Sequence, residues 1–150
     1  MAVLRLSKFT DYAVVVLIRL EEAEEGGVLT APGLAAATGL GEPTVSKVLK
    51  ILSHAGLVEG RRGAAGGYRL TRALAEMPLT EVIAAIDGPI ALTACVDNSF
   101  GVCDAEATCP VRGRWDPVND AIRRALSGIS IADLAGTPAA MPHPAPFAAE

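Results

Sequence analysis

The three cysteines of this 150-residue chain, Cys95, Cys103 and Cys109, fall within one short polar stretch, CVDNSFGVCDAEATCP. Thiolates are the ligands that soft metals and iron-sulfur clusters select, and a segment so rich in Asp, Asn, Gly and Ser is not expected to form core. Seven residues separate the first pair and five the second, so neither the C-x-x-C pair of common zinc sites nor the ferredoxin spacing is present. The spacing alone leaves an iron-sulfur cluster, zinc and free redox thiols open.

Three thiolates leave one position of a four-coordinate site to another residue. His54 is expected within a helix and His143 in a proline-rich tail, so neither histidine is well placed. A carboxylate is the remaining class of ligand, and the candidates are Asp11, Asp104 and Glu106.

The segments upstream of the cysteines predict a mostly α protein. Ser7 can cap a first helix that runs to about Glu25, and the apolar interior of this helix predicts burial or a dimer interface. Thr30 can cap a second helix, which a glycine-containing turn joins to a third helix from Pro43 to His54. This order, helix, turn, helix, is typical of a DNA-reading motif.

A short basic hairpin is predicted directly after the third helix. Residues 55–60 and 68–70 are expected to form two strands, and the glycines between them allow the chain to turn tightly. The hairpin would be the wing of a winged helix. The start of the third helix is expected to face base edges and the cations behind it to bind phosphates. The predicted DNA-binding residues are Thr44, Ser46 and Lys47 for the bases, Lys50, Arg61, Arg62 and Arg69 for phosphates, and Tyr68 beside them in the wing.

The charge distribution supports this interpretation, although the net charge is −4. Residues 30–72 carry six Lys and Arg against two Glu, a balance of +4, whereas residues 73–150 carry four Arg against ten acidic residues, a balance of −6. A basic segment in an acidic chain is typical of a DNA-binding face. No nucleophile with an adjacent base, phosphate loop or pair of catalytic carboxylates is evident, so no enzyme is predicted.

The expected location is the cytoplasm. The odd number of cysteines does not suit a full set of disulfides, and no secretory leader is visible. The longest apolar run near the start, Ala13 to Ile18, lies between Asp11 and Arg19 and is far too short to span a membrane.

Four segments are expected along the chain. Residues 1–88 would form the DNA-binding domain and residues 89–112 the cysteine loop. Residues 113–134 would supply an amphipathic dimerisation helix, with Val118, Ile122 and Leu126 in one stripe, and a short C-terminal element. Residues 135–150, rich in Pro and Ala, are expected to be a disordered tail.

From about Leu4 to Leu134, the chain resembles the winged-helix iron-sulfur regulators that include IscR and NsrR. The resemblance rests on LRLSKFTDYA, GLVEGRRGAAGGYRL, LTEVIAAIDG and the three-cysteine loop before an amphipathic helix. Through SKFTDYAVVVL and CPVR, it is most similar to the regulators of the SUF cluster-assembly operon. The resemblance implies a winged helix-turn-helix homodimer, joined by the helix from about Trp115 to Ser127, on a palindromic operator.

The resemblance also implies an iron-sulfur cluster, 2Fe-2S or 4Fe-4S, on Cys95, Cys103 and Cys109. Where IscR-like members have a ligating histidine, this chain has Arg112, and a guanidinium is not a metal ligand. NsrR-like members use an aspartate of the first helix from the other subunit, and the matching residue is Asp11. The predicted function is a regulator, expected to be a repressor, that senses cluster status and controls SUF-type genes. The alternatives are a zinc-stabilised or cofactor-free DNA-binding module that a partner protein regulates, and a cluster carrier.

Overall fold

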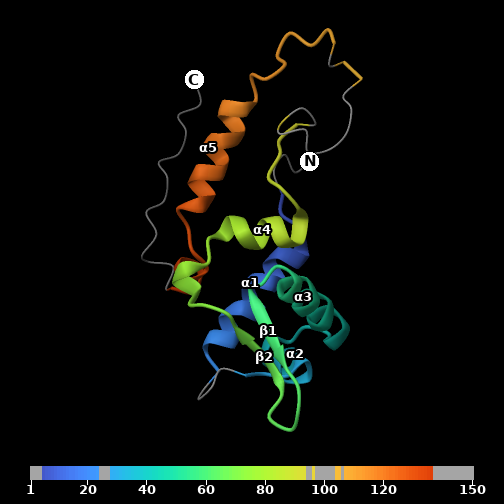
Figure 1. Ribbon diagram of the computed structural model, residues 1–150, viewed down its shortest axis with the longest axis vertical. Coiled ribbons are helices and arrows are strands. Elements are labelled where there is room, and N and C mark those ends of the chain that lie inside the picture. Colours follow the sequence, from blue (N-terminus) through green and yellow to red (C-terminus); the bar gives the residue numbers. More distant parts are fainter. Residues whose placement is uncertain (1–4, 24–27, 94–95, 97–103, 106, 137–150) are drawn as a thin grey trace.

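The computed structural model describes residues 5–23, 28–93, 96, 104–105 and 107–136, and its architecture is mostly α with one two-stranded antiparallel sheet (Figure 1). Cys95 and Cys103 lie outside the described residues, as do residues 137–150 of the expected tail. The predicted fold class, a winged helix-turn-helix, is confirmed. In chain order the elements are α1 (Lys8–Glu21), α2 (Ala31–Thr38), α3 (Glu42–His54), β1 (Val58–Arg61), β2 (Gly67–Leu70), the 3-10 turn η1 (Leu74–Glu76), α4 (Leu79–Asp87), α5 (Asp116–Ser127) and α6 (Ile131–Ala135).

Local capping explains where the first two helices begin. The hydroxyl of Ser7 accepts a hydrogen bond from the Thr10 N–H at 3.3 Å, and the hydroxyl of Thr30 accepts one from the Gly33 N–H at 3.1 Å. Helix α1 ends at Glu21, so the predicted end near Glu25 was too far along the chain. The physical reason is that Leu20 is the last buried residue of the helix, and the residues that follow are mainly glutamates, which have no apolar surface to bury in the core.

Helix α1 lies at the centre of the core, as its apolar interior predicted. Its buried residues meet α2, α3 and α4 in one cluster, and in Figure 1 these helices surround it. The cluster consists of Ala13, Val16, Leu17, Leu20, Leu34, Val45, Val48, Leu49, Leu52, Leu57, Val58, Leu74, Met77, Leu79, Val82, Ile83 and Ile131.

The last of these residues, Ile131, connects the C-terminal end of the described chain to the same core. It is fully buried, and its N–H donates to the Met77 carbonyl at 2.9 Å. The Leu79 N–H donates to the Ile129 carbonyl at 2.8 Å, which fixes the connection between α5 and α6 against the start of α4. The core formed by α1 to α4 is therefore completed by Ile131 of α6.

Helix α5 extends away from this core, and the segment before it lies at the far end of the molecule from the wing (Figure 1). Asn119 anchors the helix: it is fully buried, its amide donates to the Ile90 carbonyl at 2.9 Å, and its side-chain oxygen accepts from the Leu92 N–H at 3.0 Å. Trp115 and Val118 remain 40% and 44% exposed. An apolar helix face left open in this way is typical of an interaction surface.

None of the helices in the described part of the chain combines the length and apolar character needed to cross a membrane.

Candidate functional site

Helix α3 presents the predicted recognition surface. Its apolar stripe is buried in the core, while Ser46, Lys47 and Lys50 are exposed and Thr44 is half-buried. The helix begins with a proline in its first turn, whose fixed backbone angle suits a helix start. The residues predicted to face DNA therefore lie together on the solvent side of α3.

A hollow of about 370 Å³ separates α3 from the second strand of the wing. Ser46, Lys50, Ser53 and His54 line its helical side, and Tyr68 of β2 lines the other. Ser53 and His54 were not among the predicted DNA-binding residues. Their spacing from Ser46 and Lys50, seven and four residues respectively, places them on the same helix face and could have identified them.

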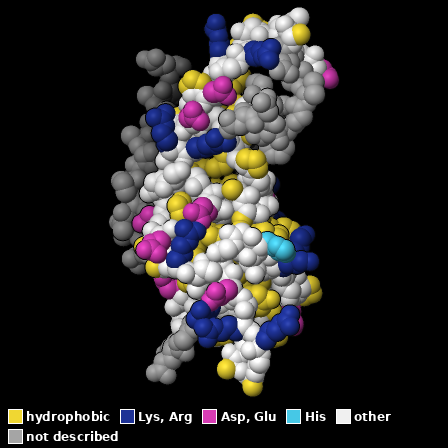
Figure 2. Space-filling model, viewed as in Figure 1, with side chains coloured by type: hydrophobic (Ala, Val, Ile, Leu, Met, Phe, Trp, Pro, Cys, Tyr) yellow, Lys and Arg dark blue, Asp and Glu magenta, His cyan; other side chains and the backbone are white. Residues whose placement is uncertain are grey.

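The wing is a regular hairpin in which Val58 faces Leu70 and Arg61 faces Gly67. A Cβ atom on Gly66 would lie 2.6 Å from the Arg61 carbonyl oxygen, so the tight tip requires glycine there. Arg61 and the neighbouring Arg62 are exposed at the tip. Figure 2 shows Lys and Arg side chains on the lower part of the molecule, where α3 and the wing lie, and others around its upper end.

The wing is also attached to the rest of the domain. The Leu29 N–H donates to the Tyr68 carbonyl at 2.9 Å, and the Tyr68 N–H donates to the Leu29 carbonyl at 2.7 Å. These two bonds form an isolated bridge between the strand β2 and the chain just before α2. The strand β2 is therefore bonded to the segment before α2 as well as to β1.

Two predicted DNA-binding cations already have partners within the chain. Arg69 forms an ion pair with Glu59, which faces it directly across the two strands. The ammonium of Lys47 lies 4.5 Å from the centre of the Phe9 ring, a cation-π contact between α3 and the start of α1. Both cations are therefore held in place by neighbours before any DNA arrives.

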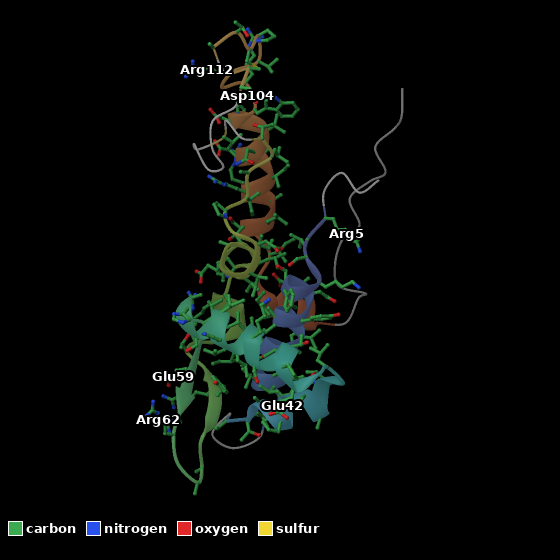
Figure 3. All side chains as sticks on the ribbon, turned by 90° about the vertical axis from the view of Figure 1, so that its right-hand side faces the viewer. Arg5, Glu42, Glu59, Arg62, Asp104 and Arg112 are labelled. Atoms are coloured by element: carbon green, nitrogen blue, oxygen red, sulfur yellow. The ribbon has the colours of Figure 1, made fainter. Side chains whose placement is uncertain are left out.

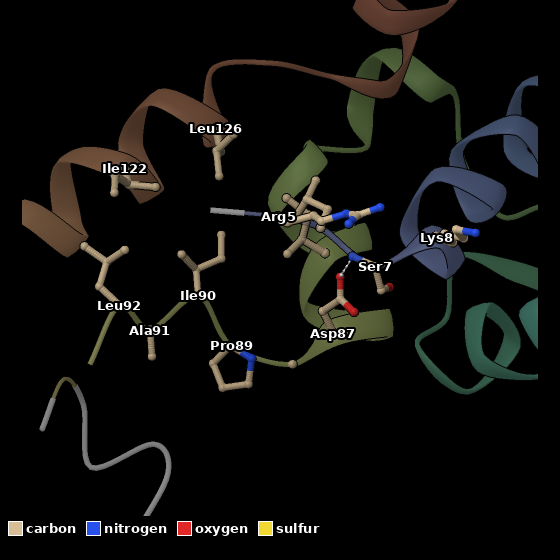
Figure 4. Close-up of a pocket in the computed structure, with 13 residues that line it drawn as sticks. Arg5, Ser7, Lys8, Asp87, Pro89, Ile90, Ala91, Leu92, Ile122 and Leu126 are labelled. Carbon is tan, nitrogen blue, oxygen red and sulfur yellow. Dashed lines mark hydrogen bonds between the residues drawn. The ribbon is translucent and has the colours of Figure 1, made fainter. Parts of the chain in front are cut away.

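The start of α1 is held by α4. The Asp87 carboxylate accepts from the Ser7 N–H at 3.1 Å, the bond that Figure 4 shows as a dashed line. It also accepts from the Thr10 hydroxyl at 2.7 Å. Partial burial opposes ionisation, but the hydrogen bonds from Ser7 and Thr10 outweigh it, so the pKa of Asp87 lies below its ordinary value of 3.8. A carboxylate at the N-terminal end of a helix is also favoured by the helix dipole.

An apolar groove lies beside this contact. Ile90 and Leu92, after α4, face Ile122 and Leu126 of α5 across it, as Figure 4 shows, and Leu6 also lines it. Two of the three residues of the predicted α5 stripe, Ile122 and Leu126, therefore line this groove, while the third, Val118, is exposed.

The described part of the chain contains one of the three cysteines. Cys109 is half-buried, and its carbonyl accepts from the Arg112 N–H at 3.4 Å. Among the described residues, no group of three or more metal-ligating side chains is brought together. The candidate Asp11 is exposed on α1, whereas Asp104 and Arg112 lie at the opposite end of the molecule from Glu59 and Arg62 of the wing (Figure 3).

The chemistry of the donor set fits a soft metal centre. Cys109 lies in a segment of successive turns whose neighbours are exposed, so its thiol is not a core side chain. The residues that would hold a cluster are the three cysteines and one carboxylate, and Asp11 of the same subunit is placed on a different element from Cys109.

Comparison with known proteins settles the family. A family model described as "Rrf2: Iron-dependent Transcriptional regulator" matches residues 6–137. The chain belongs to the Rrf2 family. The resemblance to the regulators that include IscR and NsrR is thereby confirmed, and this Rrf2 protein is a transcriptional regulator and not an enzyme.

Individual relatives of this Rrf2 chain cover most of its length. The HTH-type transcriptional regulator Rv1287 of Mycobacterium tuberculosis is 32% identical over 136 residues, which are 89% of this chain and 82% of Rv1287. The structure of CymR (YrzC), the global cysteine regulator of B. subtilis, matches with a TM-score of 0.66 and 27% identity over 88% of this chain and 96% of CymR. The structure of T. potens IscR matches with a TM-score of 0.63 and 25% identity over 94% of both chains.

Proposed function

We propose that this Rrf2 protein is a cytoplasmic homodimer that binds a palindromic operator and represses iron-sulfur cluster assembly genes of the SUF type, in response to the state of its own cluster. The observation that carries DNA binding is the joint surface of α3 and the wing, where Ser46, Lys50 and Tyr68 line one hollow beside the exposed Arg61 and Arg62. Phosphate contacts from the wing would fix the register, and the start of α3 would read bases.

The dimer is supported by the open apolar face of α5. Val118 and Trp115 are exposed, and the groove beside Ile122 and Leu126 is unfilled in one subunit. A second copy of α5 would cover both features, because a two-fold interface brings the same surface of each subunit together. Two subunits also give two recognition helices, as a palindromic operator requires.

We assign the cluster ligands to Cys95, Cys103 and Cys109 of one subunit and Asp11 of the other. Asp11 lies on α1 and Cys109 in the turns before α5, so in this proposal the ligand set draws on two elements and crosses the dimer interface. When bound, a cluster with one carboxylate among three thiolates supplies a metal site that exchanges its oxygen ligand more readily than its sulfur ligands. The chain's own part is to hold Asp11 on the first turn of α1, which Asp87 fixes against α4.

The test begins with anaerobic purification, followed by an absorbance spectrum and by iron, sulfide and zinc analysis of one sample. Matched iron and sulfide are expected, and their amount per chain assigns 2Fe-2S or 4Fe-4S. Asp11→Ala should keep the apo dimer and shorten the lifetime of the visible absorbance in air, whereas Glu21→Ala, which removes an exposed carboxylate from the other end of the same helix, is the matched control. Asp104→Ala tests the alternative carboxylate ligand and should leave the lifetime unchanged if Asp11 is the ligand. Equal lifetimes of wild type and Asp11→Ala would remove Asp11 from the ligand set.

The operator is tested by binding the holoprotein to fragmented genomic DNA of its source in the presence of competitor DNA. Fragments upstream of cluster-assembly genes are expected to be retained. Retention of other promoters would keep the DNA-binding role and refute the SUF target.

A second candidate function is supported by the likeness to CymR, whose structure is described as that of a cysteine regulator. In this alternative the chain is a zinc-stabilised or cofactor-free DNA-binding dimer that a partner protein controls. Colourless protein that fails anaerobic reconstitution, with or without zinc, would favour it over the cluster sensor. A chain that binds a cluster but retains no DNA would instead indicate a cluster carrier.

A further inference from the structure

The contact between Phe9 and Lys47 joins two elements with different predicted roles. Lys47 is an exposed residue of α3, and its ammonium lies 4.5 Å from the centre of the Phe9 ring. Phe9 belongs to the first turn of α1, which also carries Asp11. A long lysine side chain on a helix surface is ordinarily free to sample many rotamers, so a ring on one side of the ammonium restricts it.

The Phe9 ring has a second contact within α1. Phe9 meets Tyr12 edge to face, with the ring centres 6.2 Å apart and the planes at 76°. Its neighbour Thr10 is buried and donates its hydroxyl proton to Asp87 at 2.7 Å, so the turn that carries Phe9 is bonded to the end of α4. The position of the ring therefore follows the position of α1.

Lys47 is also placed differently from the other lysine of α3. Lys50 lines the hollow that faces Tyr68 and the wing, whereas Lys47 leans towards α1, where its ammonium meets the Phe9 ring. The ammonium has three N–H donors, and the ring face occupies one side of it. Because Lys47 is exposed, the remaining donors can face a phosphate that passes along the α1 side of α3.

We propose that Phe9 is a positioning residue for DNA binding, which holds Lys47 in the direction of a backbone phosphate on the α1 side of the recognition helix. The inference rests on the proposed assignment of α3 as the helix that enters the DNA. It changes the role of Lys47 from a reader of bases to a phosphate contact, and it makes the orientation of this cation depend on where α1 lies.

The experiment is a double-mutant cycle with purified full-length holoprotein and a duplex selected by the wild type from a random-sequence pool. Phe9→Leu removes the ring and keeps an apolar side chain, and it should weaken binding about two- to fivefold for each bound recognition helix, the range for an exposed cation-π contact. In the background of Lys47→Met, Phe9→Leu should have no further effect on affinity. Phe9→Tyr should retain wild-type affinity, because its ring also presents a π face.

The salt dependence separates positioning from folding. Lys47→Met should lower the slope of log K against log salt by about 0.9 for each phosphate that is no longer neutralised, and Phe9→Leu should lower it only in protein that retains Lys47. Lys50→Met is the matched control: its effect should be additive with that of Phe9→Leu, since Lys50 lies on the wing side.

The outcomes distinguish the inference from the proposed function. Equal weakening by Phe9→Leu with and without Lys47→Met would overturn the inference and give Phe9 a structural role alone. An unchanged affinity of Phe9→Leu would overturn it as well. If neither Lys47→Met nor Lys50→Met weakened binding while the wild type bound tightly, the assignment of α3 itself would be refuted.

Discussion

Two arginines of the wing, Arg62 and Arg69, are predicted to differ in DNA binding because only one of them forms an ion pair within the described part of the chain. Arg62 and Arg69 belong to the same hairpin and carry the same charge, so charge counting treats them alike. Arg69 faces Glu59 across the strands and is paired with it, whereas none of the ion pairs among the described residues involves Arg62. We therefore expect Arg62→Ala to remove a phosphate contact and Arg69→Ala to remove mainly an interaction within the wing.

The magnitude follows from the release of counterions. Each phosphate that a cation neutralises contributes about 0.9 to the slope of log K against log salt, so one contact changes the affinity about 3.5-fold between about 50 and 200 mM salt. A dimer with two wings doubles this slope contribution to about 1.8, a change of about twelvefold over the same range. The Arg69–Glu59 pair is partly exposed, 38% and 44% by side chain, so its loss should cost less than about 1 kcal/mol of folding stability.

The assay is fluorescence anisotropy of a labelled duplex, titrated with each variant at a series of salt concentrations. Arg62→Ala should flatten the salt slope, Arg69→Ala should leave it close to the wild-type value, and Glu59→Gln should steepen it because it releases Arg69 towards the DNA. A slope that falls more for Arg69→Ala than for Arg62→Ala would refute the reasoning, since it would show that the pair with Glu59 gives way to phosphate.

Three further predictions concern the fold and the dimer. Asp87→Asn should lower the free energy of unfolding at neutral pH by about 0.5–1 kcal/mol, a range that allows for the exposure of the Asp87 side chain. Because the pKa of Asp87 in the folded protein lies below 3.8, the advantage of the wild type should be present above pH 3.8 and disappear as the pH falls through the lowered pKa. Thermal unfolding at a series of pH values would measure this difference. Ile131→Ala should cost about 2–5 kcal/mol in chemical denaturation, whereas Leu134→Ala, 39% exposed on the same short helix, should cost less than about 1 kcal/mol; equal costs would contradict the placement of α6 in the core. Val118→Asp should convert dimer to monomer in analytical ultracentrifugation while Asp120→Asn, exposed on the same helix, should not; a Val118→Asp dimer of wild-type strength would refute the α5 interface.

Signals confined to a few neighbouring residues predicted most of the elements. Ser7 and Thr30 cap the helices they were expected to cap, and the predicted third helix, from Pro43 to His54, differs from α3 by one residue at its start. The wing could also be predicted, from its glycines and its short apolar strands. Capping and turn geometry depend on the local chain, so they can be recognised from the sequence.

Contacts between distant segments could not be predicted in this way. Ser7 and Asp87 are 80 positions apart, and nothing in either neighbourhood indicates that they meet. Asn119 is a polar residue on a largely exposed helix, yet it is fully buried because the backbone of Ile90 and Leu92 satisfies its amide. These pairings are set by how the helices pack, which the residue pattern of one segment does not contain.

The candidate site shows the same division. The exposed set on α3 could be predicted from helical spacing, but the partner of Arg69 depends on the register of the hairpin, in which Glu59 falls opposite it. The contact of Lys47 with Phe9 depends on the packing of α1 against α3. Lysines and arginines that look equivalent in the sequence therefore differ in how freely their charged groups can contact a DNA phosphate.

The burial of Ile131 in the core has a consequence for the order in which the protein is made. The helices and the wing of the DNA-binding unit leave the ribosome first, but the core around Met77 and Leu79 stays incomplete until Ile131 has been synthesised. By then the whole segment with Cys95, Cys103 and Cys109 has already been translated. Since domains generally fold as units, a nascent chain should complete this core only after its three cysteines have been translated.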